Sequence, residues 1–166
     1  MNKSTKRIVK SAVVAALVFI VTWSLRIPVP ATSGAYINPG DAVIYISAYL
    51  IGGPEAIIGA AIGSALADLL AGAAVYIFPT FVIKGIMALL TTALLLKRMN
   101  VRYIIACLLG GAVMTLGYGL YELFLFGTGY ALASLPANLI QWAGGSAIGI
   151  ALLPVLKKLY PYLNKA

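Results

Sequence analysis

The chain has 166 residues, of which 62% are hydrophobic and 10% are charged, so it lacks the polar surface that a water-soluble globule of this size requires. We therefore interpret it as an integral membrane protein. The net charge of +8 comes without a polar, basic face, and this argues against nucleic-acid binding.

Long apolar runs indicate that the membrane segments are helices. A bilayer core of about 30 Å needs about 20 apolar residues for each helical crossing, so this length allows about six crossings. The sequence predicts an all-α membrane protein, a six-transmembrane-helix bundle that forms one domain over residues 1–166. In chain order, the expected spans cover residues 8–25, 41–52, 55–74, 79–96, 101–126 and 135–156.

The basic residues indicate the orientation of these spans. Ten of the twelve lie in the N-terminal tail, one mid-chain loop or the C-terminal tail: Lys3, Lys6, Arg7, Lys10, Lys97, Arg98, Arg102, Lys157, Lys158 and Lys165. Membrane proteins retain Lys and Arg in their cytoplasmic loops, and six spans place all ten on one side. We therefore predict that both termini are cytoplasmic, where the basic tails also attract anionic membrane lipid.

Five charged residues fall in the outer half of this topology: Arg26, Asp41, Asp68, Lys84 and Glu122. A charge within the membrane costs about 2.5 to 3.5 kcal/mol on insertion scales, so these side chains should face the bundle interior and find partners. We expect Asp68 and Lys84 to form a buried structural ion pair. Direct contact of either residue with a substrate is the open alternative.

Polar and aromatic residues converge at the same depth. Asn138, Gln141 and Trp142 share one helical face, and Tyr118 and Glu122 share another. Such a set suits a small, flat molecule that forms hydrogen bonds, held in a site that opens outward beneath the loop of residues 27–40. The candidate substrate-binding residues are Asn38, Asp41, Tyr45, Lys84, Tyr118, Glu122, Asn138, Gln141 and Trp142.

Catalysis has little support in the sequence. The chain has no His and one Cys, Cys107, which lies in an apolar run, and it shows no metal-ligand spacing or nucleotide-binding motif. We predict that it is not an enzyme and that it holds no metal or cofactor. Any energy for active transport would come from another subunit, and a stand-alone secondary carrier is the alternative.

Small residues recur four positions apart in the first span, at Ala12 and Ala16. Small side chains let helices approach closely in lipid. They could serve packing within the bundle or present a surface to another membrane protein.

A series of motifs between residues 38 and 85 resembles the substrate-binding S components of energy-coupling factor (ECF) vitamin transporters, most of all the branch labelled riboflavin-type. The motifs are Asn38-Pro39-Gly40-Asp41, Gly53-Pro54, Gly59 with Gly63-Ser64, Ala67-Asp68-Leu69-Leu70-Ala71-Gly72 and Thr80-Phe81-Val82-Ile83-Lys84-Gly85.

This resemblance implies a six-helix bundle in the bacterial cell membrane that binds a vitamin near its outer face. It also implies two kinds of partner, a transmembrane coupling subunit and two cytoplasmic ABC ATPases. Ala12 and Ala16 match the small-residue motif that this family uses against the coupling subunit. The pattern of acidic and aromatic residues associated with riboflavin binders is not evident, so we favour pyridoxine or hydroxymethylpyrimidine as the substrate. Riboflavin or another vitamin is the alternative.

Overall fold

The computed structural model describes residues 2–30, 34–95 and 100–163, and most of these residues are helical. Among the basic residues used to orient the chain, Lys97, Arg98 and Lys165 lie outside the described residues. The α-helices are α1 (Lys3–Ser24), α2 (Gly40–Leu50), α3 (Gly53–Leu70), α4 (Ile77–Leu94), α5 (Asn100–Phe126), α6 (Thr128–Ala151) and α7 (Leu153–Leu163). The short 3-10 helix η1 (Ala74–Tyr76) leads into α4, and the strands β1 (Ile27–Pro28) and β2 (Tyr36–Ile37) form an antiparallel pair between α1 and α2.

Four stretches of the described chain are long and apolar enough to cross a membrane: α1, α3, η1 with α4, and α5. A fifth is present if α6 and α7, which meet at an angle of 59°, count as one bent span. The structure therefore supports an all-α membrane protein. The count of six crossings and the cytoplasmic placement of both termini stay predictions.

The last predicted span differs most from the structure. Residues 127–134 were expected to form a loop, but Gly127 adopts a φ of 84° and lets α6 begin at Thr128. At the other end, Pro154 lacks an amide hydrogen and its ring crowds the preceding turn, so the helix bends near Leu152. The predicted span of residues 135–156 is therefore split between α6 and α7.

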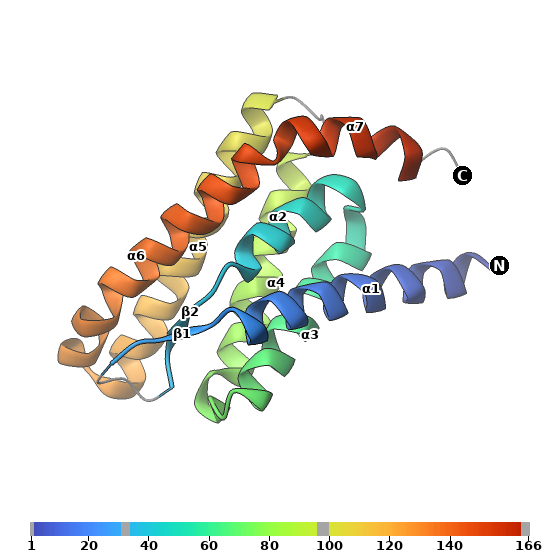
Figure 1. The fold of residues 1–166 in the computed structure, drawn as a ribbon. Helices are drawn as coiled ribbons and strands as arrows, with labels where there is room; N and C mark the ends of the chain where they lie inside the picture. The colour runs from blue at the N-terminus through green and yellow to red at the C-terminus, as the bar shows by residue number, and fades with distance from the viewer. Residues whose placement is uncertain (1, 31–33, 96–99, 164–166) are drawn as a thin grey trace.

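Helix α2 lies in the middle of the bundle, and this position explains its length. Around it, α1 packs against α3, α3 against α4, α4 against α5 and α5 against α6. Helix α2 contacts α1, α3, α4, α5, α6 and α7 (Figure 1), and most of its residues are buried. A helix of 11 residues can therefore be apolar without facing lipid.

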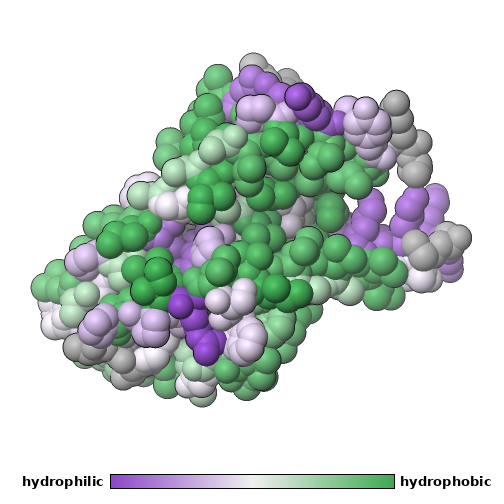
Figure 2. Space-filling model, in the orientation of Figure 1, coloured by the Kyte–Doolittle hydropathy of each residue, from purple (hydrophilic) through white to green (hydrophobic). Residues whose placement is uncertain are grey.

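The outer surface of the bundle is mostly hydrophobic. Figure 2 shows hydrophobic side chains over most of one face, with hydrophilic groups gathered mainly toward its ends and edges. Exposed side chains such as Leu17, Leu89, Leu116 and Ile140 belong to four different helices. This surface suits a hydrocarbon environment and not water.

Close contact between α1 and α3 depends on glycine. A Cβ atom added at Gly59 would lie 2.6 Å from Val14 Cβ and 2.8 Å from the Ser11 carbonyl oxygen. We expect Gly59→Ala to lower the free energy of unfolding by about 1 to 3 kcal/mol, because α1 must move away from α3. Reversible unfolding in detergent would measure this loss.

Gly144 provides the matched control for that variant. It also lies within a helix, but a Cβ atom added there meets nothing within 4 Å. Gly144→Ala should be neutral or slightly stabilising, since Ala favours helix more than Gly does. Equal losses from the two variants would contradict the proposed role of Gly59.

Candidate functional site

A cavity opens beneath the β1–β2 segment, between α3, α4, α5 and α6. Its volume is about 430 Å³, including space that is open to solvent. Its lining is largely polar and aromatic. Six of the predicted binding residues lie on its wall: Asn38, Lys84, Tyr118, Glu122, Asn138 and Gln141.

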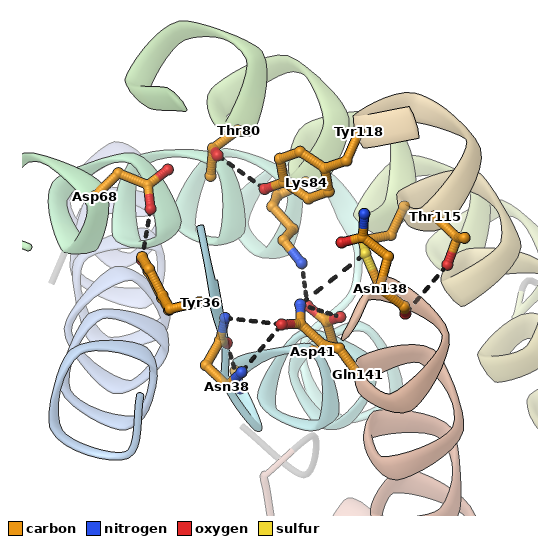
Figure 3. Close-up of polar contacts among 12 residues, drawn as sticks. Tyr36, Asn38, Asp41, Asp68, Thr80, Lys84, Thr115, Tyr118, Asn138 and Gln141 are labelled. Atoms are coloured by element: carbon orange, nitrogen blue, oxygen red, sulfur yellow. Dashed lines mark hydrogen bonds and ion pairs between the residues drawn. The ribbon is translucent and has the colours of Figure 1, made fainter. Parts of the chain in front are cut away.

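One wall of the cavity is a connected polar network (Figure 3). Lys84 Nζ forms an ion pair with Asp41 Oδ1, and Gln141 Nε2 donates to Asp41 Oδ2 at 3.0 Å. Gln141 Oε1 accepts hydrogen bonds from the Asn38 backbone amide at 3.0 Å and from Asn38 Nδ2 at 3.2 Å. Asp41 and Lys84 are only 1% and 3% exposed, so this network is buried and its orientation is fixed.

The ion pair in this network differs from the predicted one. Lys84 was expected to pair with Asp68, but its ion-pair partner is Asp41. The reason is the central position of α2, whose first turn brings Asp41 to Lys84 on α4. Asp68 instead accepts a hydrogen bond from the Tyr36 hydroxyl at 2.5 Å.

Tyr36 joins the β1–β2 segment to the bundle. The residue lies on β2, and its hydroxyl reaches Asp68 on α3. Burial raises the pKa of Tyr36 above its ordinary value, and the nearby Asp68 carboxyl shifts the pKa in the same direction. The hydroxyl therefore stays protonated and donates throughout the physiological pH range.

Glu122 belongs to a second polar cluster at the cavity. Its Oε1 atom accepts from the Tyr76 hydroxyl at 3.0 Å, and its Oε2 atom accepts from the Ser134 hydroxyl. The hydroxyls of Tyr76 and Tyr130 lie 3.0 Å apart. Both carboxyl oxygens thus have protein partners, which tie α5 to η1 and α6.

Three predicted binding residues do not line the cavity. Tyr45 is fully buried in the core, where a Cβ atom added at Gly110 would come within 2.8 Å of its ring. Trp142 packs against Gly111 on α5, and a Cβ atom there would overlap the indole. For Trp142, the reason is that the helical face shared with Gln141 is wide enough to reach both the cavity and the neighbouring helix α5. Asp41 is behind the wall, where it contacts Lys84 and Gln141.

Several polar groups that line the cavity were not among the predicted binding residues. Asp68 was interpreted as structural, and Ser64 and Thr80 were not considered as binding residues, but all three lie on the wall. Ser64 is one helical turn before Asp68, and Thr80 is one turn before Lys84. The four-residue spacing from a charged residue was the signal that could have identified them.

A second, mostly apolar groove runs along α1 and α3. It has a volume of about 1540 Å³, including open solvent, and Ala12, Ala16, Ile58 and Ile62 contribute to its wall. Ala12 and Ala16 are exposed, so they are not used for packing inside the bundle.

The helical bundle and its polar cavity define an integral membrane protein that can enclose a small, polar molecule. The model of the family described as "ECF-type riboflavin transporter, S component" matches residues 2–158. The chain belongs to this family. It is therefore a vitamin-type substrate-binding component of a transporter and not an enzyme.

Two relatives match most of the chain. An uncharacterized protein from Pyrococcus woesei is 36% identical over 142 residues, which cover 85% of this chain and 95% of the relative. The thiamine precursor transporter HmpT of Lactococcus lactis subsp. cremoris (strain MG1363) is 29% identical over 157 residues, or 95% of this chain and 91% of HmpT.

A solved structure of the S component of a bacterial ECF transporter has the same fold. It superposes with a TM-score of 0.73 at 21% sequence identity. The match covers 98% of this chain and 100% of the solved chain.

Proposed function

We propose that this protein captures a small heteroaromatic vitamin or vitamin precursor, hydroxymethylpyrimidine or pyridoxine, in the cavity beneath the β1–β2 segment. The observation that carries the proposal is the cavity itself, which combines aromatic rings with a fixed network of hydrogen-bonding groups. The likeness to a thiamine precursor transporter over 95% of the chain supports the same substrate class.

The size of the cavity favours a single ring. Its volume of about 430 Å³ includes space that is open to solvent, so the enclosed part is smaller than this. Riboflavin has three fused rings and a polyol chain, so it needs more space than a pyridine or pyrimidine. Around a single ring, Tyr36 and Tyr118 supply aromatic surface, and Lys84 has further N–H donors beyond the one that Asp41 accepts.

The experiment that tests this function is calorimetric titration of the purified chain with hydroxymethylpyrimidine, pyridoxine and riboflavin. We expect tight binding of one of the two single-ring compounds. Binding of riboflavin alone would contradict the substrate class. Absence of binding, together with solute uptake by liposomes that hold only this chain, would favour a stand-alone carrier.

We also propose six membrane crossings. Four are the long spans, and the other two are α2 and the bent α6–α7 pair. The beginning of α1 and the end of α7 lie at the same end of the bundle (Figure 1), which supports an even number of crossings. Lys6 and Arg7 on α1, and Lys157 and Lys158 on α7, are exposed there. Their charge supports a cytoplasmic location for this end in the cell membrane.

For transport, we propose that the α1–α3 groove binds a transmembrane coupling subunit, which links this chain to two cytoplasmic ABC ATPases. Exposed alanines at four-residue spacing support this role, because small side chains allow another helix to approach closely. The surrounding side chains, such as Ile58 and Ile62, are apolar and suit a contact made within the membrane.

The variant Ala12→Trp tests this interface. We expect it to abolish co-purification with a coupling subunit, a loss of at least about tenfold, and to leave ligand affinity unchanged, because the groove is separate from the cavity. Leu17→Trp is the matched control, since Leu17 is exposed on α1 but does not line the groove. An intact complex with Ala12→Trp would contradict the interface.

A further inference from the structure

We propose that Asp68 binds the substrate directly and selects an aminopyrimidine, with Asp68 Oδ2 accepting a hydrogen bond from the amino group on the ring. This inference rests on the proposed function and names the chemical class of its substrate. It also gives Asp68 a role other than the structural ion pair that the sequence suggested.

The first observation is an unpartnered acceptor. Asp68 is 4% exposed and lines the cavity. Tyr36 donates to its Oδ1 atom, but the buried Oδ2 atom has no hydrogen-bond partner within the described part of the chain. A buried carboxyl oxygen without a partner is unfavourable, so a donor on a bound ligand would stabilise it.

The neighbouring polar groups have hydrogen bonds of their own. Lys84 forms its ion pair with Asp41, and the hydroxyls of Thr80 and Tyr118 lie 2.8 Å apart in a hydrogen bond with each other. Both Thr80 and Lys84 lie near enough to Asp68 to stabilise its charge. Figure 3 shows Asp68 and Tyr36 on one side, and the Lys84 network on the other. None of these hydrogen bonds is made to Asp68 Oδ2.

A second observation concerns Asn138, on the α6 side of the same cavity. Its Nδ2 atom is buried and makes no hydrogen bond to the described residues. Glu122 lies close enough to interact with Asn138, but the hydrogen bonds that its two oxygens accept come from Tyr76 and Ser134. Among the described residues, the cavity thus has an acceptor without a partner at Asp68 and a donor without a partner at Asn138.

An aminopyrimidine matches this pair of groups. Its amino group donates, its ring nitrogens accept, and all of them lie in the plane of one aromatic ring. Pyridoxine has hydroxyl groups and a ring nitrogen but no amino group. A site built to bind a particular N–H group strongly rejects an analogue without it, because its own polar group would remain unpartnered. Asp68 would therefore distinguish the two candidate substrates of the proposed function.

The first test uses the unaltered protein and two ligands, hydroxymethylpyrimidine with its amino group and the analogue that has a ring oxo group in its place. Calorimetric titration measures both affinities. We expect the oxo analogue to bind at least about tenfold more weakly, since an oxygen acceptor would face Asp68 Oδ2. This comparison does not depend on the folding of any variant.

The second test is Asp68→Asn. The amide keeps an oxygen that can accept from Tyr36 and replaces the second carboxyl oxygen with a donor. We expect the affinity ratio of amino to oxo ligand to fall at least about tenfold. Glu55→Gln is the matched control, because it makes the same chemical change on α3 at the Arg7 ion pair, outside the cavity, and should leave the ratio unchanged.

The outcomes separate this inference from the proposed function. Equal binding of both ligands by the unaltered chain, an unchanged ratio in Asp68→Asn, or binding of pyridoxine alone would overturn the role of Asp68 while the proposed function stands. If the chain binds no single-ring compound, the proposed function fails, and the assignment of Asp68 fails with it.

Discussion

Lys84→Met is expected to lower the free energy of unfolding by about 3 to 5 kcal/mol, because it leaves the buried Asp41 carboxylate without its cation. Asp41 is 1% exposed, and Gln141 then remains its only side-chain partner among the described residues. One amide donor does not neutralise a carboxylate in a medium of low dielectric constant. Reversible unfolding in detergent, followed by tyrosine and tryptophan fluorescence, measures the loss.

Second-site variants identify the carboxylate that depends on Lys84. Adding Asp41→Asn to Lys84→Met should restore most of the lost stability, because the variant no longer buries an unpaired charge at that position. Adding Asp68→Asn to Lys84→Met should restore much less, since Asp68 has Tyr36 as its partner. Greater recovery with Asp68→Asn would contradict the Asp41–Lys84 pair and support the pair expected from the sequence.

The long helices could be predicted because local properties determine them. The apolar runs of residues 55–74, 79–96 and 101–126 correspond to α3, α4 and α5 with shifts of a few residues. Length and hydropathy suffice there, since a helix is the structure that satisfies its own backbone in lipid. The early start of α6 depends on the backbone of Gly127, and its end depends on the clash at Pro154, so hydropathy alone did not place either boundary.

The position of α2 could not be predicted in the same way. Its 11 residues, most of them apolar, resemble a short crossing, but their burial depends on the packing of the surrounding helices. The ion-pair partner of Lys84 could not be predicted for the same reason. Helical spacing placed Asn138 and Gln141 on one face, and both line the cavity, whereas the partner of Lys84 depends on where α2 enters the bundle.

Trp142 shows a related limit of helical spacing. The sequence suggested that Trp142 binds the substrate, but its indole packs over Gly111 and does not line the cavity. We therefore expect Trp142→Ala to lower the free energy of unfolding by about 3 kcal/mol, through lost packing between α5 and α6. Ligand affinity should change less than about threefold, because the contact is outside the cavity. Thermal unfolding and calorimetric titration of the same preparation measure both quantities.

A double-mutant cycle with Gly111 tests the contact itself. Gly111→Ala alone should be destabilising, because its new methyl group would overlap the Trp142 indole. In the Trp142→Ala background the same methyl group has room, so the stability cost of Gly111→Ala should largely disappear. The two positions should therefore show a coupling energy of about 1 to 3 kcal/mol. Additive losses would contradict the contact. A large loss of affinity with unchanged stability would instead restore Trp142 as a substrate-stacking residue and move the binding site toward α6.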